Sequence, residues 1–264
     1  MHHLYKVKSH TTKQQYDVCV ICCARNGELY ANESIFSVVG QKSCNFKLML
    51  LDDASSDNTM NECLEILKNN NIDYEAYRSD VNIGVPVARN ILASMCSCLY
   101  ISIHDIDDIM MPFRLCVQCS FLNQNADIDC VGGHAYKIDS EGRFLDIMSY
   151  PPKNNVDIVD MLPGRVNPMI DPTTMMRLNS FRQMNGYSEH ADVRLAQDFD
   201  LWIRMSRQRM KLANIQNALT QYRVSESSLT LSKKNEMIRA HVHVQSMHRS
   251  FLDNIRRKNV KSNK

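Results

Sequence analysis

Two clusters of carboxylates stand directly behind apolar runs of the chain. Asp52 and Asp53 end one run, and Asp105, Asp107 and Asp108 end another. Crowded carboxylates repel one another unless a cation offsets their charge, and Asp-x-Asp suits a hard divalent ion such as Mn²⁺ or Mg²⁺. One such cluster would be ordinary in a loop behind a strand. Two in corresponding positions predict a site for a metal ion and a ligand.

The elements that must position these clusters alternate between strand and helix. Short apolar runs predict buried strands at 17–23, 47–51, 74–78 and 99–103. This alternation predicts a mainly parallel α/β sheet with helices on both faces. Because ligands bind beyond the carboxyl ends of parallel strands, both acidic clusters should lie on one edge of the sheet. Helical spacing or helix-start signals predict the intervening helices at 28–39, at 59–67 (with Thr59 and Glu62 as a capping box), at 86–96 and from Pro112 onward.

The alternation changes after about residue 129, which predicts a mixed second half. Strands are expected at 129–136 and 172–177, with a hairpin turn at 139–142. The remaining expected elements are helices at 156–162, 180–185 and 197–209, an extended segment at 211–223, and a helix at 233–257 followed by a basic tail.

Composition excludes several classes of protein. The chain has 264 residues, and its 31 Lys and Arg against 29 Asp and Glu give a net charge of +2. A near-balanced charge argues against a nucleic-acid binder. No apolar run approaches the roughly 20 residues of a membrane-spanning helix. The first residues contain no apolar core of a secretory signal, so we expect a cytoplasmic location.

The ten cysteines allow two interpretations. Disulfides are rare in a reducing compartment, so a structural zinc site is the alternative to free thiols. Two C-x-x-C pairs exist, Cys19/Cys22 and Cys116/Cys119. The first pair falls in a predicted strand, whose period would point its thiols to opposite faces. The second falls in a helical pattern without a nearby His pair. The pattern favours buried free thiols that act as small hydrophobes.

Five segments, in order, resemble the GT-A fold of glycosyltransferase family 2, over about residues 17–230. The resemblance implies a Rossmann-like nucleotide-binding sheet followed by an acceptor-binding half. Any one segment would be a weak match, whereas five in the family's order are specific. The segments are 18–26, 34–59, Asn82-Ile83-Gly84 through Ala88-Arg89-Asn90, Asp105-Ile106-Asp107-Asp108 as the Asp-x-Asp metal motif, and 196–204 with Asp198.

The resemblance implies roles for residues on the donor side. Asp107 would bind a divalent cation, Mn²⁺ or Mg²⁺, that bridges the donor diphosphate, and Asp105 would support the sugar or ribose. Asp53 would contact the nucleotide base or ribose. Arg89 would orient the acidic edge or approach the donor; the alternative is a helix-surface arginine paired with a structural carboxylate. The other nucleotide-side candidates are Ala24, Arg25, Asn26 and Glu28.

Asp198 takes the place of the family's catalytic base. An acceptor hydroxyl needs a carboxylate within hydrogen-bond reach of its proton. Without the resemblance Asp198 would be interpreted as a helix cap, and a helix N-terminus keeps a carboxylate charged but makes it a weaker base. Three residues depart from the family pattern. Gln197 stands where many members carry Glu, Ser225 where His is frequent, and His104 where the position is usually apolar; a buried, hydrogen-bonded imidazole is favoured there.

The resulting expectation is a metal-dependent, inverting hexosyltransferase of glycan biosynthesis. It would move a sugar from a nucleotide-diphosphate sugar, a UDP-sugar first, to a hydroxyl of a glycan or other acceptor. The alternative is a nucleotide- or glycan-binding protein of the same fold without turnover. A sugar-1-phosphate nucleotidyltransferase is disfavoured, because residues 23–28 contain one glycine and no Gly-rich basic loop.

The expected organisation has three parts. A polar N-terminal segment at 1–16 precedes a single domain at 17–232, and a C-terminal helix with a basic tail follows at 233–264. The domain would divide into a nucleotide-sugar half at 17–128 and an acceptor half at 129–232. The C-terminal helix is expected to pack on the second half; the alternative is a contact with a partner or a membrane surface.

Overall fold

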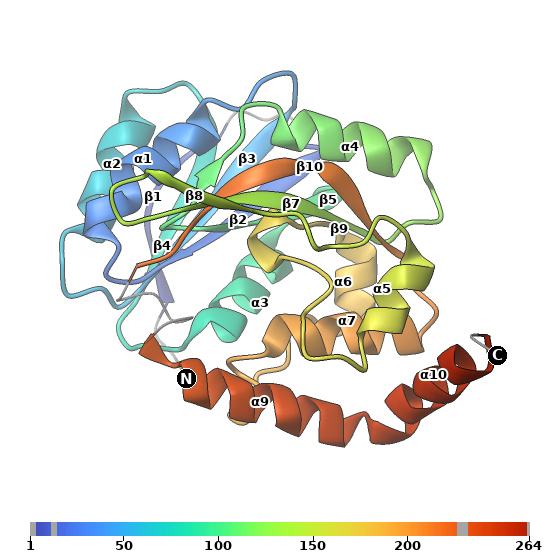
Figure 1. The fold of residues 1–264 in the computed structure, drawn as a ribbon. Coiled ribbons are helices and arrows are strands. Elements are labelled where there is room, and N and C mark those ends of the chain that lie inside the picture. Colours follow the sequence, from blue (N-terminus) through green and yellow to red (C-terminus); the bar gives the residue numbers. More distant parts are fainter. Residues whose placement is uncertain (1–3, 12–14, 226–231, 263–264) are drawn as a thin grey trace.

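A computed structural model describes residues 4–11, 15–225 and 232–262. Its strands form one sheet in the order β1-β4-β3-β2-β5-β9-β7-β10-β6, with β8 paired to β7 (Figure 1). The strands are β1 (Leu4–His10), β2 (Val18–Ala24), β3 (Phe46–Asp53), β4 (Asp73–Ser79), β5 (Tyr100–Asp105), β6 (Ile109–Met110), β7 (Cys130–Ile138), β8 (Phe144–Met148), β9 (Met175–Arg177) and β10 (Leu212–Arg223).

The four strands predicted in the first half are parallel neighbours, as expected. Strand β2 lies between β3 and β5, and β4 flanks β3. In register, Ala24 lies opposite Asp52 and Cys23 lies opposite Asp105. The loops behind β2, β3 and β5 therefore leave the sheet side by side at its carboxyl edge, where the sequence predicts the site.

Helices cover both faces of the sheet, which confirms the α/β expectation (Figure 1). Two clusters of buried apolar side chains lie on the two faces, and Cys19 and Cys22 belong to different clusters, as the strand period predicts. One face carries α1 (Glu28–Val39), α2 (Thr59–Lys68) and α4 (Arg114–Gln124). The other carries α3 (Val85–Met95), α5 (Asn155–Met161), α6 (Leu178–Gln183) and α7 (Gln197–Arg207).

The second half extends the same sheet with mixed strand directions. Strand β10 is parallel to β7, whereas β9 and β8 run antiparallel to β7. The hairpin turn predicted at 139–142 joins β7 to β8. The strand predicted at 172–177 is wrong in its first part, where a 3₁₀ turn at Asp171–Thr173 precedes β9. Pro172 lacks a backbone N–H and fits the start of such a turn better than a central strand.

The segment 1–16, expected only to be polar, contains a strand. Strand β1 pairs antiparallel with β4 and forms the edge of the sheet. Lys6 makes an ion pair with Glu75 at 2.7 Å on this edge. Most side chains of β1 are exposed, and its alternation of Tyr5 and Val7 with Lys6 and Lys8 is too short to stand out in a polar segment. Charged, polar edge strands of this kind discourage pairing with other chains.

The C-terminal segment forms two helices instead of the predicted one. They are α9 (Lys234–Met247) and α10 (Arg249–Ser262), and His248 lies between them. His248 is buried, and its Nε2 lies 2.9 Å from Asp200 Oδ1 on α7. The break between α9 and α10 therefore lies where the imidazole of His248 meets a buried partner. The ring of His241 stacks on Phe199 at 3.9 Å between centroids. The expected packing on the second half is confirmed for the described part of this segment, 232–262.

None of the helices among the described residues is both long enough and apolar enough to cross a membrane.

Candidate active site

The loop behind β2 is hydrogen-bonded to the loop behind β3. Ala24, the buried last residue of β2, leads into Arg25, whose Nη1 donates to the backbone oxygen of Asp53 at 3.1 Å. The backbone N–H of Asn26 donates to Ser55 Oγ at 3.0 Å. Asn26 has a φ of 48°, which turns the chain sharply into α1. The two loops therefore form one rigid rim beyond the strands.

Glu28 continues this rim at the start of α1. Its Oε2 accepts a hydrogen bond from the backbone N–H of Asn58 at 3.1 Å. The capping box predicted here is wrong, because α2 begins at Thr59 and Asn58 precedes it. The Thr59 hydroxyl donates to Asp57 instead, and Glu62 accepts from the Asn58 side chain at 3.0 Å. Glu28 thus has a structural partner in the loop behind β3.

Asp53 joins the rim to the loop in front of α3. Its two carboxylate oxygens accept from the backbone N–H groups of Ile83 at 2.7 Å and Gly84 at 2.8 Å. Gly84 has a φ of +85°, a conformation that favours glycine, and this turn aims its N–H at the carboxylate. Asp53 is buried, with 4% of its surface exposed. In this structure it therefore orders the loop at 82–84, which is part of the family resemblance.

Arg89 bridges two carboxylates and is itself buried. Its guanidinium contacts Asp105 Oδ1 at 2.6 Å and Asp171 Oδ2 at 2.5 Å, and it is 2% exposed. Tyr187 donates to the other oxygen of Asp171 at 2.9 Å. Of the two interpretations of Arg89, this geometry fits a residue that orients the acidic edge. Arg89 is paired with carboxylates, as the alternative also requires, but it is buried and does not lie on the helix surface.

The loop behind β5 is fixed from the other side by Arg223 at the end of β10. Its backbone N–H donates to Asp108 Oδ1 at 2.9 Å and its Nε to the backbone oxygen of Asp107 at 2.8 Å. The same guanidinium pairs with Glu33 at 2.6 Å and lies over the ring of Tyr30 at 4.6 Å. Arg223 therefore holds the backbone of the Asp-x-Asp segment and leaves the Asp107 carboxylate available.

The Asp107 carboxylate has the properties of a metal ligand. Apart from its own backbone N–H, no group of the described residues donates a hydrogen bond to it. Burial and the nearby charge of Asp105 raise its pKa to about 6. A carboxylate so destabilised gains from a cation beside it. These residues fit Mn²⁺ or Mg²⁺, ions that proteins often hold through one or two carboxylates together with the phosphates of a substrate.

Asp198 is the second residue of α7, whose N-cap is Ala196, so the capping interpretation is wrong. Asn167 Nδ2 donates to Asp198 Oδ2 at 2.6 Å. Burial and the charge of Asp171 raise the pKa of Asp198 to about 7, against the lowering effect of backbone N–H groups and Arg89. The effect of burial on the pKa of Asp198 therefore outweighs that of the helix N-terminus.

Asp200, two residues further along α7, has the opposite environment. His248 Nε2 lies 2.9 Å from its Oδ1, and Arg204 Nε donates to its Oδ2 at 2.6 Å. Burial acts to raise the pKa of Asp200, yet His248 and Arg204 outweigh it, and the pKa lies below its usual range. Asp200 therefore anchors α7 to the junction of α9 and α10, whereas the Asp198 carboxylate is bound by Asn167.

His104 is a buried, neutral residue. Its Nε2 lies 2.9 Å from Ser34 Oγ, and it has no exposed surface. Burial, together with the charge of Arg114, lowers the pKa of His104 to about 3. The expectation of a buried, hydrogen-bonded imidazole is confirmed.

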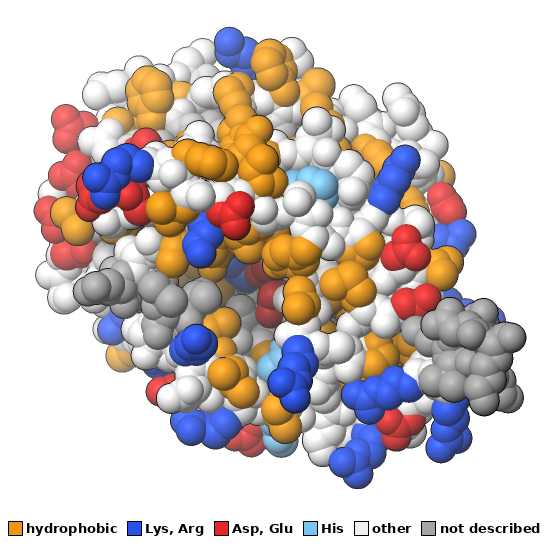
Figure 2. Space-filling view, in the orientation of Figure 1, with side chains coloured by type: hydrophobic (Ala, Val, Ile, Leu, Met, Phe, Trp, Pro, Cys, Tyr) orange, Lys and Arg blue, Asp and Glu red, His pale blue; other side chains and the backbone are white. Residues whose placement is uncertain are grey.

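The face of the molecule in Figure 2 is hollowed between β8 and α9, and acidic side chains are visible in the depth of the hollow. Sequence reasoning missed several residues around the carboxylates. Asp171 and Tyr187 belong to no motif of the resemblance, and their partner Arg89 is 82 residues from Asp171. Arg223 ends the extended segment expected at 211–223. Its basic side chain at that end was the available signal for a partner of the carboxylates. The other residue missed was Asn167.

Comparison with solved structures defines the class of fold. The chain matches the UDP complex of Staphylococcus aureus TarS, residues 1–349, with a TM-score of 0.65 and 18% identity; the match covers 86% of this chain and 64% of that one. It also matches the mannosyltransferase PcManGT of Pyrobaculum calidifontis, in complex with GDP-Man and Mn²⁺, with a TM-score of 0.61 and 13% identity, over 80% of this chain and 57% of that one. The fold is GT-A, and the chain spans less than two thirds of these structures.

The sequence comparisons define the family. The family model described as "Glycosyl transferase family 2" matches residues 19–184. EpsE of Bacillus subtilis (strain 168), which its name describes as a glycosyltransferase, is 32% identical over 227 residues, 83% of this chain and 76% of EpsE. The O-antigen biosynthesis glycosyltransferase WbnJ of Escherichia coli is 26% identical over 218 residues, 80% of this chain and 81% of WbnJ. The chain belongs to glycosyltransferase family 2. Asp198 lies beyond the residues that the family model matches.

Proposed function

We propose that the protein is a metal-dependent, inverting glycosyltransferase that moves a hexose from a nucleotide-diphosphate sugar to an acceptor hydroxyl. The observation that carries the proposal is the chain of charges Asp105–Arg89–Asp171. It joins the Asp-x-Asp segment to the surroundings of Asp198, whose pKa Asp171 helps to raise. Metal ligand and base thus belong to one site at the carboxyl edge of the sheet.

The donor side follows from the loops. Ala24, Arg25, Asn26 and Glu28 form the rim on which the nucleotide would lie, and Asp53 orders the adjoining loop. Solved structures of the same fold support the donor class, because they are complexes with UDP, UDP-GlcNAc and GDP-Man. A UDP-sugar is our first expectation.

Asp107 would hold the divalent cation, for which Mn²⁺ is the first candidate because the PcManGT complex contains it. When bound, a divalent cation stabilises the negative charge that develops on a leaving diphosphate. Arg89 keeps Asp105 directed toward this region and offsets part of the charge of the aspartates. Arg223 fixes the backbone between them, so the aspartates keep their positions when the donor enters or leaves.

Asp198 would remove the proton of the acceptor hydroxyl. Its pKa of about 7 lies near the operating pH, where a general base is most effective. Asn167 holds one oxygen and so fixes the direction of the other. Attack from the side of Asp198, opposite the departing diphosphate, inverts the anomeric configuration. We place this activity in the cytoplasm, and the ten free cysteines support a reducing compartment.

A nucleotide screen tests this function. Thermal unfolding is measured with UDP, GDP and dTDP and their sugars, with and without Mn²⁺. The correct donor raises the midpoint only when Mn²⁺ is present, because a ligand that binds the folded state stabilises it. Release of nucleoside diphosphate is then measured with that donor. Metal-dependent binding without any release would support the binding protein without turnover. A product of retained configuration would contradict the inverting mechanism.

A further inference from the structure

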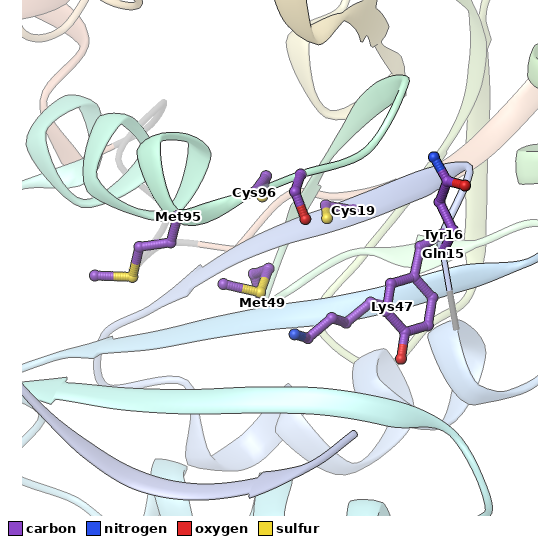
Figure 3. Close-up of a pocket in the computed structure, with 8 residues that line it drawn as sticks. Gln15, Tyr16, Cys19, Lys47, Met49, Met95 and Cys96 are labelled. Carbon is purple, nitrogen blue, oxygen red and sulfur yellow. The ribbon is translucent and has the colours of Figure 1, made fainter. Parts of the chain in front are cut away.

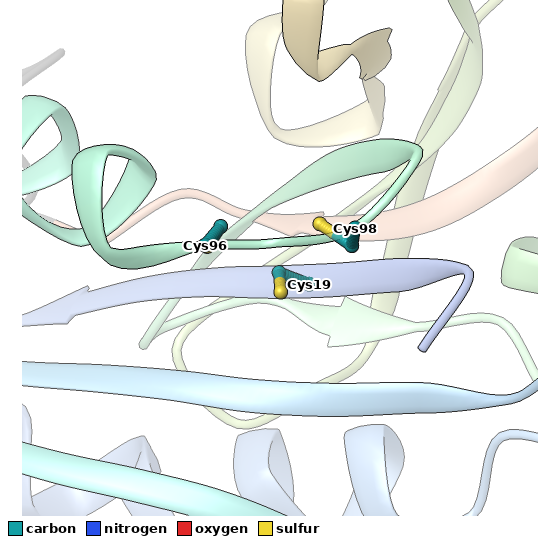
Figure 4. A group of neighbouring side chains, drawn as sticks. All are labelled: Cys19, Cys96 and Cys98. Atoms are coloured by element: carbon teal, nitrogen blue, oxygen red, sulfur yellow. The ribbon is translucent and has the colours of Figure 1, made fainter. Parts of the chain in front are cut away.

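Three cysteines meet at the edge of the sheet opposite the carboxylates. Within the described residues, one group of three potential metal ligands has its ligand atoms all within 4.8 Å of one another, and it consists of Cys19, Cys96 and Cys98. Cys19 belongs to β2, Cys96 ends α3, and Cys98 precedes β5 (Figure 4). Because β2 and β5 are parallel neighbours, the chain connecting α3 to β5 passes beside the start of β2.

A pocket of about 290 Å³ opens on this cluster (Figure 3). Cys19 and Cys96 line it together with two thioethers, those of Met49 and Met95. Sulfur ligands select soft metal ions such as Zn²⁺ and Cu⁺ over the hard ions that suit carboxylates. The pocket also provides a path by which an ion reaches two of the three thiols, which are themselves 3% and 4% exposed.

We propose that Cys19, Cys96 and Cys98 bind one thiophilic metal ion, Zn²⁺ or Cu⁺, through three thiolates. Zinc–sulfur bonds of about 2.3 Å place the sulfurs of a tetrahedral site about 3.8 Å apart. The three sulfur atoms lie within 4.8 Å of one another, so small side-chain adjustments bring them to that spacing. Zn²⁺ would keep a fourth position for water from the pocket, and Cu⁺ would need only the three thiolates.

The protons displaced by the metal are identifiable. Cys98 Sγ donates to the backbone oxygen of Tyr100 at 3.0 Å, and Cys96 Sγ donates to that of Leu92 at 3.2 Å. Binding releases these protons and that of Cys19 to solvent, since thiolates are the ligands. Three thiolates with Zn²⁺ carry a net charge of −1, and with Cu⁺ a net charge of −2.

Two basic residues are placed to offset that charge. Arg182 Nη2 donates to the backbone oxygen of Cys96 at 2.6 Å, and Lys47 lines the pocket beside Cys19. The positive charges of Arg182 and Lys47 would offset part of the negative charge of the three thiolates.

The ion would fasten the end of α3 to the start of β2. The same helix carries Arg89, so the site would stabilise the scaffold of the proposed catalytic edge without taking part in the reaction. The inference does not rest on the proposed function, because thiolates and carboxylates lie at opposite ends of the strands.

Anaerobic titration of the reduced full chain with Cd²⁺ tests the site. Cadmium bound by thiolates absorbs in the ultraviolet through charge transfer, whereas cadmium bound by carboxylates does not. We expect a band that saturates at one equivalent and that Zn²⁺ or Cu⁺ displaces; the tighter competitor identifies the preferred ion. Zn²⁺ should also raise the unfolding midpoint, and a chelator should reverse the rise.

Variants distinguish this site from other thiols. Cys98→Ser, at the least buried of the three, should abolish the band, and Cys96→Ala is the second variant if the first does not fold. Cys119→Ser is the matched control, because Cys119 Sγ lies 3.8 Å from Cys44 Sγ in a different cysteine pair. It should retain the band, as should Asp107→Asn. A band that survives Cys98→Ser, no band in the reduced wild type, or a disulfide among the three cysteines in freshly purified protein would overturn the proposal.

Discussion

Two regions of the carboxyl edge satisfy their polar groups in opposite ways. In the hydrogen-bonded loops (24–28, 52–59 and 82–84), polar side chains are paired with backbone N–H and C=O groups of neighbouring loops. In the carboxylate group (Asp105, Asp107, Asp171 and Asp198), burial and mutual repulsion raise the pKa of Asp107, Asp171 and Asp198. The polar groups of the first region are hydrogen-bonded, whereas the carboxylates of the second are destabilised in their charged form. Destabilised carboxylates cluster at functional sites, and here they include the proposed metal ligand and the proposed base.

Asp198→Asn should have the largest effect of the substitutions in the carboxylate group. The amide is nearly isosteric and cannot accept the acceptor's proton, so transfer should fall by roughly 10²–10⁴-fold. Donor binding should persist, since Asp107 is untouched. In the wild type, the rate should rise as the pH passes about 7, because the base must lose its proton. Initial rates over pH check both points. Near-normal transfer by Asp198→Asn would remove it from the mechanism.

Arg89→Met tests whether one cation holds the carboxylate group together. It leaves Asp105 and the buried Asp171 without their shared partner, and breaking a buried ion pair costs about 3–5 kcal/mol. Lys211→Met is the control, because it removes an ion pair with Asp127 that is exposed on both sides. Chemical denaturation should show a large loss for Arg89→Met and no measurable loss for the control. Equal, small losses would mean that the charge chain is not structural.

Asp107→Asn separates the metal ion from the rest of the site. It removes an anionic ligand while keeping the side chain's size, so donor affinity measured with Mn²⁺ should fall by about 10²-fold, the equivalent of a few kcal/mol of metal-ion stabilisation. Wild-type affinity should also fall below a pH of about 6, where the carboxylate takes up a proton. Asp146→Asn on the exposed strand β8 is the control and should change neither. Unchanged Mn²⁺ dependence in Asp107→Asn would reassign the metal.

Asp53→Ala tests the other region. It leaves the N–H groups of Ile83 and Gly84 without their acceptor, which costs about 1–3 kcal/mol when such groups are buried. Nucleotide affinity should fall with the order of the loop, while the rate at saturating donor should change little. Calorimetric titration with the nucleotide alone measures the first effect. An unchanged dissociation constant would exclude the loop ordered by Asp53 from the donor surface.

The sequence was sufficient for the parts of this fold that local pattern specifies. Apolar runs identified β2 to β5, and acidic residues behind them identified the edge that carries the site. Strand β1 escaped because its alternation of Tyr5 and Val7 with Lys6 and Lys8 is short and lies in a segment that is polar overall. The C-terminal break at His248 escaped because it depends on a buried partner, Asp200, in another helix.

The candidate site shows the same division. Asp107 and Asp198 could be chosen from motifs, whereas Asp171 could not, because its role comes from Arg89 across 82 residues. The thiols are a sharper case. The C-x-x-C spacings drew attention to Cys22 and Cys116, yet the cluster that forms takes only Cys19 from those pairs. It depends on which strands become neighbours, and no spacing in the sequence encodes that.

The smallest expected effect is on the pH dependence of stability, to which the raised pKa of Asp198 contributes. In the folded protein Asp198 has a pKa of about 7, above the value of 3.8 for the unfolded chain. Between these pH values the folded state holds a proton that the unfolded state has lost, so the contribution of Asp198 to the stability of the wild type falls as the pH rises. The Asp198→Asn variant lacks this pH-dependent contribution.

The stability of Asp198→Asn relative to the wild type should therefore increase between a pH of about 4 and a pH of about 7. Each unit by which the pKa is raised corresponds to about 1.4 kcal/mol, and we expect a gain of at least that size. Urea denaturation of both proteins across this range measures it, with Asp146→Asn as a control for the loss of one exposed carboxylate. A difference that stays constant with pH would mean that Asp198 is ionised at no cost. The carboxylate group would then differ from the hydrogen-bonded loops in position alone.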